Sequence, residues 1–124
     1  MNIPDKLFYT KDHEWVNIDN GIATIGITDY AQDELGDVIF IEFIEIGSIC
    51  NARDTIGTIE AVKTVADIFS PLKGTVSKIN RDLEDNPDLI NRDPYDAGWI
   101  IKLDSISIDK SNLLSASDYR EFVQ

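Results

Sequence analysis

Apolar residues occur in several short stretches that are bounded by polar and glycine-containing turn segments, as is typical of β-strands. Two such stretches, residues 13–18 (HEWVNI) and 22–27 (IATIGI), flank the tripeptide DNG at 19–21. Asp, Asn and Gly tolerate a positive φ better than most residues, and tight hairpin connections require one. We therefore predict a β-hairpin over residues 13–27.

Three further stretches have the composition of strands: residues 37–46 (DVIFIEFIEI), 75–80 and 99–103. The chain contains 19 Ile against 8 Leu and 6 Val. Ile is β-branched, and the restricted χ1 of β-branched residues favours strands over helices. The composition therefore favours an all-β body.

Helix signals lie at the margins of this pattern. Residues 28–35 (TDYAQDEL) have an acid in the first turn, and Gly36 follows at the place where helices often end on glycine. In the tail, Ser115 begins a variant of the capping box ahead of Tyr119 and Phe122. We predict a short helix at each of these places, and an acidic, Pro- and Asn-rich excursion at residues 82–96.

Residues 54–70 (DTIGTIEAVKTVADIFS) fit two structures. Ile56, Ile59 and Val62 recur at helical spacing, but eight of the fifteen residues from 55 to 69 are β-branched. The second observation favours two strands with a tight turn at residues 61–64, although that turn contains no Gly, Asn or Pro. Propensity alone leaves the helix and the hairpin open.

The length of 124 residues suits one domain, residues 1–124, and excludes a large multi-domain enzyme. Eleven Lys and Arg against 23 Asp and Glu give a formal net charge of −12. Nine of the acids lie between Lys11 and Arg53, with no basic residue among them. Nucleic acids and anionic membranes attract cationic proteins, so we expect neither as a partner.

Few residues are available for a disulfide or a metal site. The chain has one cysteine, Cys50, and one histidine, His13, too few for a disulfide or a four-ligand Cys/His zinc site. The longest apolar run, residues 38–41, is far shorter than the roughly 18 residues of a membrane helix, and the N-terminus lacks the apolar segment of a secretory signal. We expect no metal and a reducing compartment: the bacterial cytoplasm, or the mitochondrial matrix if a targeting peptide has been removed.

Catalytic groups are equally sparse. A nucleophilic triad would need His13 as its base, and a surface or capping role is the simpler interpretation of this histidine. No glycine-rich phosphate-binding motif is present, and adjacent acids such as Asp33 and Glu34 are expected by chance in so acidic a chain. We predict that the chain is not an enzyme.

Lys63 is the anomalous residue. It lies at the turn of the predicted hairpin, with Arg53 and Lys73 as its nearest basic neighbours. An exposed lysine has a pKa of roughly 10.4 and is a poor nucleophile at neutral pH. An amine at a rigid hairpin tip can, however, be acylated by another enzyme and carry a cofactor such as biotin or lipoate. From spacing alone, an ordinary solvated lysine is the simpler interpretation.

Five segments change this balance. Residues 57–71 (GTIEAVKTVADIFSP), which include Lys63, resemble the lipoyl-attachment region of the glycine cleavage system H-protein family. Four further segments resemble the family and occur in the same order along the chain: residues 9–16 (YTKDHEWV), 26–37 (GITDYAQDELGD), 86–102 (NPDLINRDPYDAGWIIK) and 113–119 (LLSASDY). The resemblance covers nearly the whole chain, whereas a general lipoyl or biotinyl domain would share only the hairpin.

The resemblance implies a barrel-sandwich hybrid of the lipoyl-domain kind: an all-β fold with short peripheral helices, a C-terminal helix and a hairpin at about residues 55–70. It also implies a carrier with lipoate attached through Lys63. Four partner enzymes are implied. A pyridoxal-phosphate glycine decarboxylase loads an aminomethyl group, and a tetrahydrofolate-dependent aminomethyltransferase removes it. A dihydrolipoyl dehydrogenase reoxidises the dithiol, and a lipoylating enzyme attaches the lipoate.

The resemblance also implies roles for three acids. Glu60, three residues before Lys63, matches the acid of the attachment motif and would serve recognition by the lipoylating enzyme. Glu14 and Asp67 match positions that the family places near the cleft for the aminomethyl-bearing arm. Glu34 stands where some relatives have His, so a contact to the arm there would differ.

Two other functions stay open from the sequence. An H-like protein could relay lipoyl groups to 2-oxoacid dehydrogenases, or the chain could be an acidic interaction module without a cofactor. Biotin carriage is disfavoured, because biotinyl sites usually have Met beside the lysine, whereas Val62 and Thr64 flank it here.

Overall fold

The computed structural model describes residues 1–124, and most of them lie in or between nine strands. The strands are β1 (Phe8–Tyr9), β2 (Glu14–Asp19), β3 (Ile22–Ile27), β4 (Val38–Phe43), β5 (Ile49–Cys50), β6 (Thr55–Ala61), β7 (Val65–Phe69), β8 (Lys73–Ile79) and β9 (Ile101–Ser107). The helices are α1 (Asp29–Leu35), α2 (Asp82–Asp85), α3 (Leu89–Arg92), α4 (Ala116–Phe122) and the 3-10 turn η1 (Lys110–Asn112).

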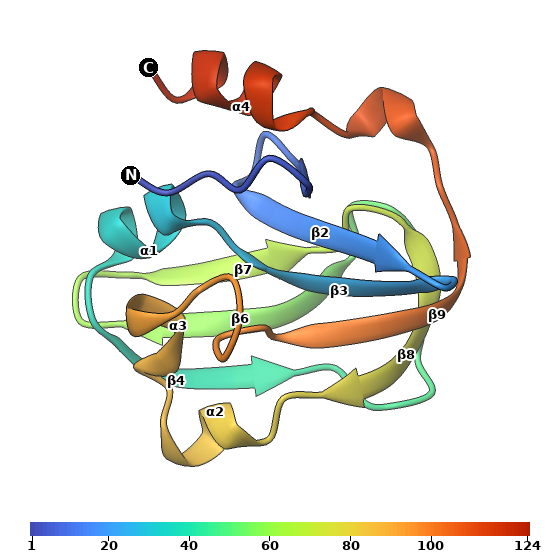
Figure 1. Ribbon diagram of the computed structural model, residues 1–124. Coiled ribbons are helices and arrows are strands. Elements are labelled where there is room, and N and C mark those ends of the chain that lie inside the picture. The colour runs from blue at the N-terminus through green and yellow to red at the C-terminus, as the bar shows by residue number, and fades with distance from the viewer.

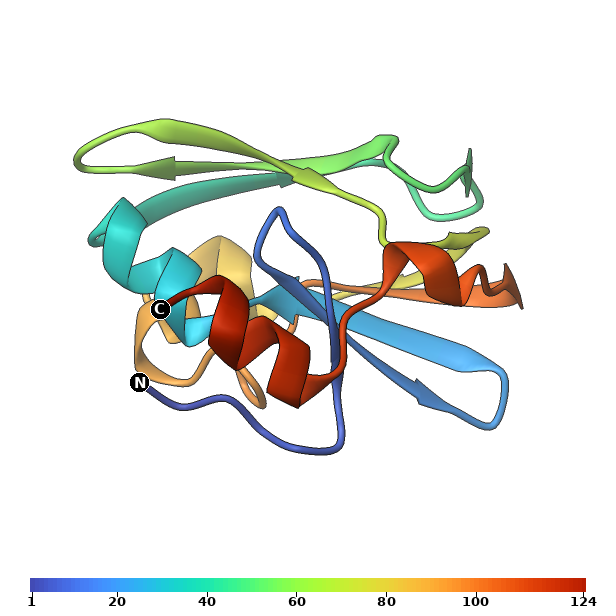
Figure 2. The same ribbon diagram turned by 90° about the horizontal axis from the view of Figure 1, so that it is seen from above.

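The strands form two antiparallel sheets that face each other (Figures 1 and 2). The larger sheet has the order β1-β2-β3-β9-β8-β5 and the smaller sheet the order β4-β6-β7. No strand pairing joins the two sheets, so they do not close into a barrel. In Figure 2 the smaller sheet forms the upper layer, and the tip of its β6–β7 hairpin projects beside α1. No helix is long and apolar enough to cross a membrane.

The first predicted hairpin is confirmed. β2 and β3 pair from Glu14 and Ile27 to Asp19 and Ile22, and a two-residue loop joins them. Both loop residues have a positive φ, 51° at Asn20 and 75° at Gly21, as a type I′ turn requires. The strand begins one residue later than expected, because His13 has a φ of 67°.

Residues 54–70 form two strands and not a helix. β6 pairs with β7 on one side and with β4 on the other, so its backbone groups are satisfied across the sheet. From Gly57 onward the burial alternates as in a sheet: Ile59 and Ala61 are buried, whereas Glu60 is exposed. Ile56 is also buried, and it lies where the register shifts between Thr55 and Gly57. Pairing with β4, which no local pattern predicts, resolves the ambiguity in favour of the hairpin.

Both predicted helices are confirmed, as are the predicted roles of Ser115 and Gly36 at their ends. Thr28 Oγ1 accepts a hydrogen bond from Ala31 N at 3.1 Å at the start of α1. Ser115 Oγ accepts one from Asp118 N, also at 3.1 Å, at the start of α4. Gly36 ends α1 with a φ of 76°.

Other predicted segments also differ from the structure, and the strand expected over 75–80 covers Lys73–Ile79. The strand expected over 37–46 ends at Phe43, ahead of the turn in which Gly47 has a φ of 93°. The last strand covers Ile101–Ser107 and not 99–103, because Asn80 Nδ2 donates to the carbonyls of Ala97 and Trp99 and holds that segment as a turn. The excursion at 82–96 contains α2 and α3, which are too short to show a helical period.

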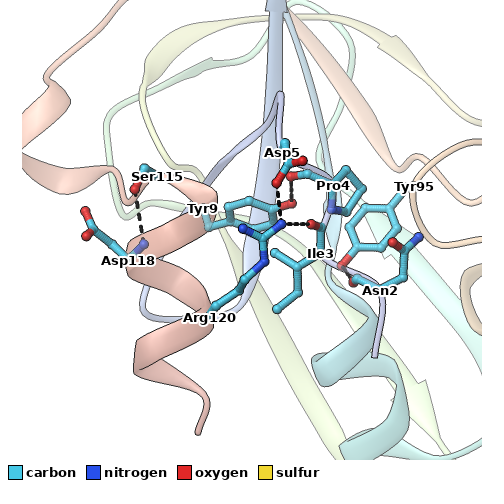
Figure 3. Close-up of polar contacts among 9 residues, drawn as sticks. All are labelled: Asn2, Ile3, Pro4, Asp5, Tyr9, Tyr95, Ser115, Asp118 and Arg120. Carbon is cyan, nitrogen blue, oxygen red and sulfur yellow. Dashed lines mark hydrogen bonds and ion pairs between the residues drawn. The ribbon is translucent and has the colours of Figure 1, made fainter.

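Two apolar clusters hold the molecule together. The larger has 19 buried residues and lies between the sheets, with Ile as its commonest side chain. The smaller joins the N-terminal segment to α4 through Tyr9 and Tyr119, whose rings stack with centroids 4.6 Å apart. Figure 3 shows the polar part of this contact: Arg120 donates to the Ile3 carbonyl at 2.9 Å and pairs with Asp5. Docking of α4 brings Tyr119 toward the N-terminal end of β2.

Candidate functional site

Lys63 lies at the tip of the β6–β7 hairpin, and the tip is held from two sides. Ala61 N donates to the Thr64 carbonyl at 2.8 Å, which closes the turn. Val62 N donates to the Asp37 carbonyl at 2.9 Å, which ties the turn to the segment that enters β4. Lys63 itself is exposed, and none of the four salt bridges in the structure involves it. The backbone is fixed while the amine is free to react.

The stem of Lys63 rests on Gly36 at the end of α1. A Cβ placed on Gly36 would lie 3.3 Å from Lys63 Cε and 3.4 Å from Cδ, so the missing side chain makes room for these methylenes. Gly36 also has a positive φ, which a glycine adopts at low cost. Gly36 thus both ends α1 and leaves space for the side chain of Lys63.

A cleft of about 310 Å3 runs between α1 and the smaller sheet. Two of its walls end beside Lys63: α1 leads to Gly36, and β7 begins two residues after the lysine. Its apolar lining comes from Ile27, Tyr30, Ala31, Leu35, Ile59, Ala66 and Ile68, and its polar lining from Asp12, His13, Glu14, Glu34 and Asp67. The cleft therefore combines an apolar surface with several carboxyl groups.

Glu14 is the buried acid of this cleft, with 2% of its surface exposed. Thr10 Oγ1 donates to Glu14 Oε1 at 2.6 Å, and Phe69 N donates to Oε2 at 3.3 Å. Burial raises the pKa of Glu14 to about 7, although these two hydrogen bonds act in the opposite direction. The carboxyl group therefore gains or loses a proton near neutral pH.

The other two predicted acids lie on the hairpin. Asp67, on β7, is exposed at the mouth of the cleft and accepts a hydrogen bond from Thr58 Oγ1 at 3.1 Å. Glu60, on β6, is exposed near the tip, opposite Val65 in the register, and does not line the cleft. The fold therefore brings Glu14 and Asp67 to one cleft and leaves Glu60 beside the lysine.

His13 is a cleft residue that the sequence interpretation missed. It is half-buried: Nδ1 lies 2.9 Å from the Tyr119 hydroxyl and the ring packs on Tyr30 with centroids 4.6 Å apart. Burial lowers the pKa of His13, against the charges of Asp12 and Glu34. The structure thus places His13 in the wall of the cleft, where the sequence indicated a surface or capping residue. The hydrogen-bond partner of the ring, Tyr119, is 106 residues away, so no local pattern could predict this contact.

The residues present fit a lipoyl group. An exposed amine without a partner at a fixed tip can be acylated without breaking a hydrogen bond or a salt bridge. The apolar wall of the cleft suits the carbon chain and sulfur atoms of such a group, and the carboxyl groups suit a cationic cargo.

Comparison with known proteins identifies the same family over the whole chain. The sequence model of the family described as "Glycine cleavage H-protein" matches residues 7–124. The chain is 50% identical over 122 residues to the glycine cleavage system H protein of Listeria monocytogenes serotype 4a, and the aligned region covers 98% of each of the two chains. It is 45% identical over 125 residues to that of Staphylococcus epidermidis, covering 99% of this chain and 98% of the relative.

The fold agrees with a solved structure. The crystal structure of a glycine cleavage system H protein from Mycobacterium marinum matches with a TM-score of 0.87 and 35% identity, over 96% of this chain and 97% of that chain. This match confirms the lipoyl-domain-like arrangement of two sheets with peripheral helices that the resemblance implied. The chain belongs to the glycine cleavage H-protein family, whose members are carrier subunits of the glycine cleavage system.

Proposed function

We propose that this chain carries lipoate in amide linkage to Lys63 and shuttles the aminomethyl group of glycine between enzymes. One observation supports this most directly: the lysine amine is exposed and unpaired at a hairpin tip whose backbone is fixed by Asp37 and Thr64. Family membership supplies the chemistry. Lipoate would supply a disulfide that accepts the aminomethyl group and is regenerated by oxidation of the resulting dithiol.

The hairpin is the part of the chain that the lipoylating enzyme would read. Glu60 and Lys63 lie on the same exposed end of the hairpin, so one enzyme surface can contact both. We assign Glu60 to this recognition. Acylation turns the lysine amine into a neutral amide, so the formal net charge of −12 becomes −13 in the modified chain.

We assign Glu14 and Asp67 to the cationic amino group of the cargo. A nearby ammonium group favours the carboxylate form of Glu14, whose pKa is otherwise about 7, and a charge-assisted hydrogen bond would form as the proton leaves. The apolar walls reduce access of water, which slows loss of ammonia from the cargo.

Four enzymes follow from this proposal as partners: the glycine decarboxylase, the aminomethyltransferase, the dihydrolipoyl dehydrogenase and the lipoylating enzyme. The chain itself would act as their common substrate and not as a catalyst. The relatives compared above come from bacteria, and we propose the bacterial cytoplasm as the compartment.

Intact-mass measurement of the chain produced in cells with active lipoylation tests site and cofactor together. We expect the mass to increase by one lipoyl amide in the natural chain and in Lys73→Arg, a control that changes an exposed lysine elsewhere. Lys63→Arg should lack the increase and should not support glycine cleavage in a reconstituted system. An unmodified natural chain, or full activity of the Lys63→Arg protein, would overturn the proposal and favour an interaction module without a cofactor.

A further inference from the structure

β4 is the free edge of the smaller sheet, and α2 lies beside it (Figure 1). Residues of both elements line a second groove. Its volume is about 620 Å3, and it shares no residue with the cleft that contains Glu14. Phe40, Phe43 and Ile46 form part of its apolar lining. Phe40 and Ile46 are 49% and 54% exposed. Apolar side chains grouped in a groove with a polar border are typical of protein interaction sites.

The border of this groove is strongly acidic. It carries Glu42 and Glu45 on one side and Glu84 and Asp85 on α2. Its one basic residue, Arg81, donates from Nη1 to Glu84 Oε1 at 2.9 Å, so these two charges cancel. Glu42, Glu45 and Asp85 form no salt bridge. No Lys or Arg occurs in β4, β6 or β7, so the negative charge has no neighbour on the sheet to balance it.

We infer that this groove is a docking site for a surface segment of a partner enzyme that presents apolar side chains flanked by Lys or Arg. Charge complementarity selects this occupant: the three unpaired acids attract basic groups, while the apolar lining is covered by the side chains between them. A second copy of this chain would bring a net charge of −12 to an acidic border and would be repelled.

The groove and the lysine belong to the same sheet. Phe40 lies opposite Glu60 in the β4–β6 register, and Glu60 precedes Lys63 by three residues. A partner seated at the edge of β4 would therefore hold the hairpin in a fixed orientation without covering the cleft. This inference rests on the proposed function, because it assigns the groove to one or more of the three enzymes that act on the lipoyl arm.

The test uses the lipoylated full chain as substrate for the glycine decarboxylase, the aminomethyltransferase and the dihydrolipoyl dehydrogenase in separate assays. Ile46→Ser removes an apolar contact, and Glu45→Gln/Asp85→Asn removes two unpaired charges. We expect each change to raise KM about fivefold for at least one enzyme, with kcat unchanged. Thermal unfolding checks that each variant is folded.

Matched controls separate the groove from general effects. Ile49→Ser removes an even more exposed Ile, on β5 of the larger sheet, and Asp19→Asn/Glu121→Gln removes two charges outside the groove. Both should change KM less than twofold. KM values of the groove variants within twofold of the natural chain for all three enzymes, or equal effects in the controls, would overturn the inference.

Failure of the proposed function is distinguishable from failure of this inference. Intact mass is measured first: a chain without a lipoyl group contradicts the proposed function. In that case the Kd of each enzyme for the unmodified chain replaces KM, and the same comparison of groove variants with controls decides whether the groove binds a partner.

Discussion

Glu14 is a carboxyl group that the fold removes from water without giving it a basic partner. Burial of an unpaired carboxylate costs free energy, and the two hydrogen bonds from Thr10 and Phe69 offset part of that cost. Such a residue is suited to receive a cation, because a positively charged cargo would relieve the same cost. In the protein without cargo, the Glu14 carboxyl group should make the free energy of unfolding depend on pH.

The first prediction concerns that pH dependence. Folding raises the pKa of Glu14 from 4.5 to about 7, so between these pH values the folded chain binds more protons than the unfolded chain. The free energy of unfolding should therefore fall as pH rises through this range, by up to about 3 kcal/mol from this group. Glu14→Gln removes the titration, so the variant should gain stability relative to the natural chain as pH increases.

Urea unfolding of both proteins at pH 5 and pH 8 measures the effect. His13 contributes with the opposite sign below pH 6.5, because burial lowers its pKa. Its contribution is common to both proteins and cancels in the difference between them. Parallel pH profiles for the natural chain and Glu14→Gln would contradict the prediction.

The β6–β7 hairpin is the element that carries Lys63, and the register of the hairpin against β4 depends on Gly57. A Cβ on Gly57 would lie 2.7 Å from the Glu42 carbonyl oxygen, a backbone atom that cannot move without shifting β4. Glycine permits this close approach of two strands. The position of Lys63 thus depends on a residue six positions before it.

The second prediction is that Gly57→Ala lowers the free energy of unfolding by about 2–3 kcal/mol through overpacking. Gly21→Ala is the control: its added Cβ would meet no atom within 4 Å, so the positive φ of 75° is its main penalty, about 1 kcal/mol. Urea denaturation of the two variants gives the comparison. Equal losses would show that the contact with Glu42 does not limit the hairpin.

Asn91 of α3 connects the elements around the lysine. Val38 N donates to Asn91 Oδ1 at 2.9 Å, and Asn91 Nδ2 donates to the Gly36 carbonyl at 2.9 Å. One side chain therefore holds both ends of the segment whose Asp37 carbonyl accepts from Val62 N. The third prediction is that Asn91→Ala costs about 1–3 kcal/mol and speeds hydrogen exchange at the Val62 amide.

NMR-detected hydrogen exchange measures this link in the folded state. Asn112→Ala is the matched control, because Asn112 is exposed on η1 and its side chain makes one long hydrogen bond of 3.5 Å to Asp109. The control should leave exchange at Val62 unchanged. Unchanged exchange in Asn91→Ala would mean that the hairpin tip is held without α3.

How far the sequence predicts these elements depends on the range of the contacts that form them. The β2–β3 hairpin, the cap Ser115 and the terminal glycine Gly36 follow from neighbouring residues, and local patterns predicted them. The choice between helix and hairpin at 54–70 depends on pairing with β4, so the pattern left it open. The cleft joins Glu14 to Phe69, 55 residues apart, and the family resemblance and not the pattern pointed to its acids.

At the scale of the whole molecule, the negative charge is mostly unpaired. Four salt bridges, all between partly exposed side chains, involve four of the 23 acids, so most carboxylates face solvent without a basic partner. Like charges at this density limit self-association and attract basic surfaces over about 8 Å at physiological salt. A carrier that meets several enzymes in turn gains from such attraction in the rate of encounter.

The fourth prediction is that association of the lipoylated chain with its partner enzymes slows as salt increases. Electrostatic steering acts on kon and is screened by ions, so raising ionic strength from about 0.05 to 0.5 M should lower kon about tenfold while koff changes less. Stopped-flow measurements give both rates. Two double variants locate the attraction. The variant Asp19→Asn/Glu121→Gln changes residues outside the groove between β4 and α2 and should reduce the salt dependence of kon slightly, through net charge alone. The variant Glu45→Gln/Asp85→Asn changes residues of the groove and should reduce the salt dependence of kon more. Both variants remove two negative charges, so a larger change of the salt dependence in the second variant would locate the attraction at the groove. A kon that is independent of salt would show that the net charge has no part in docking.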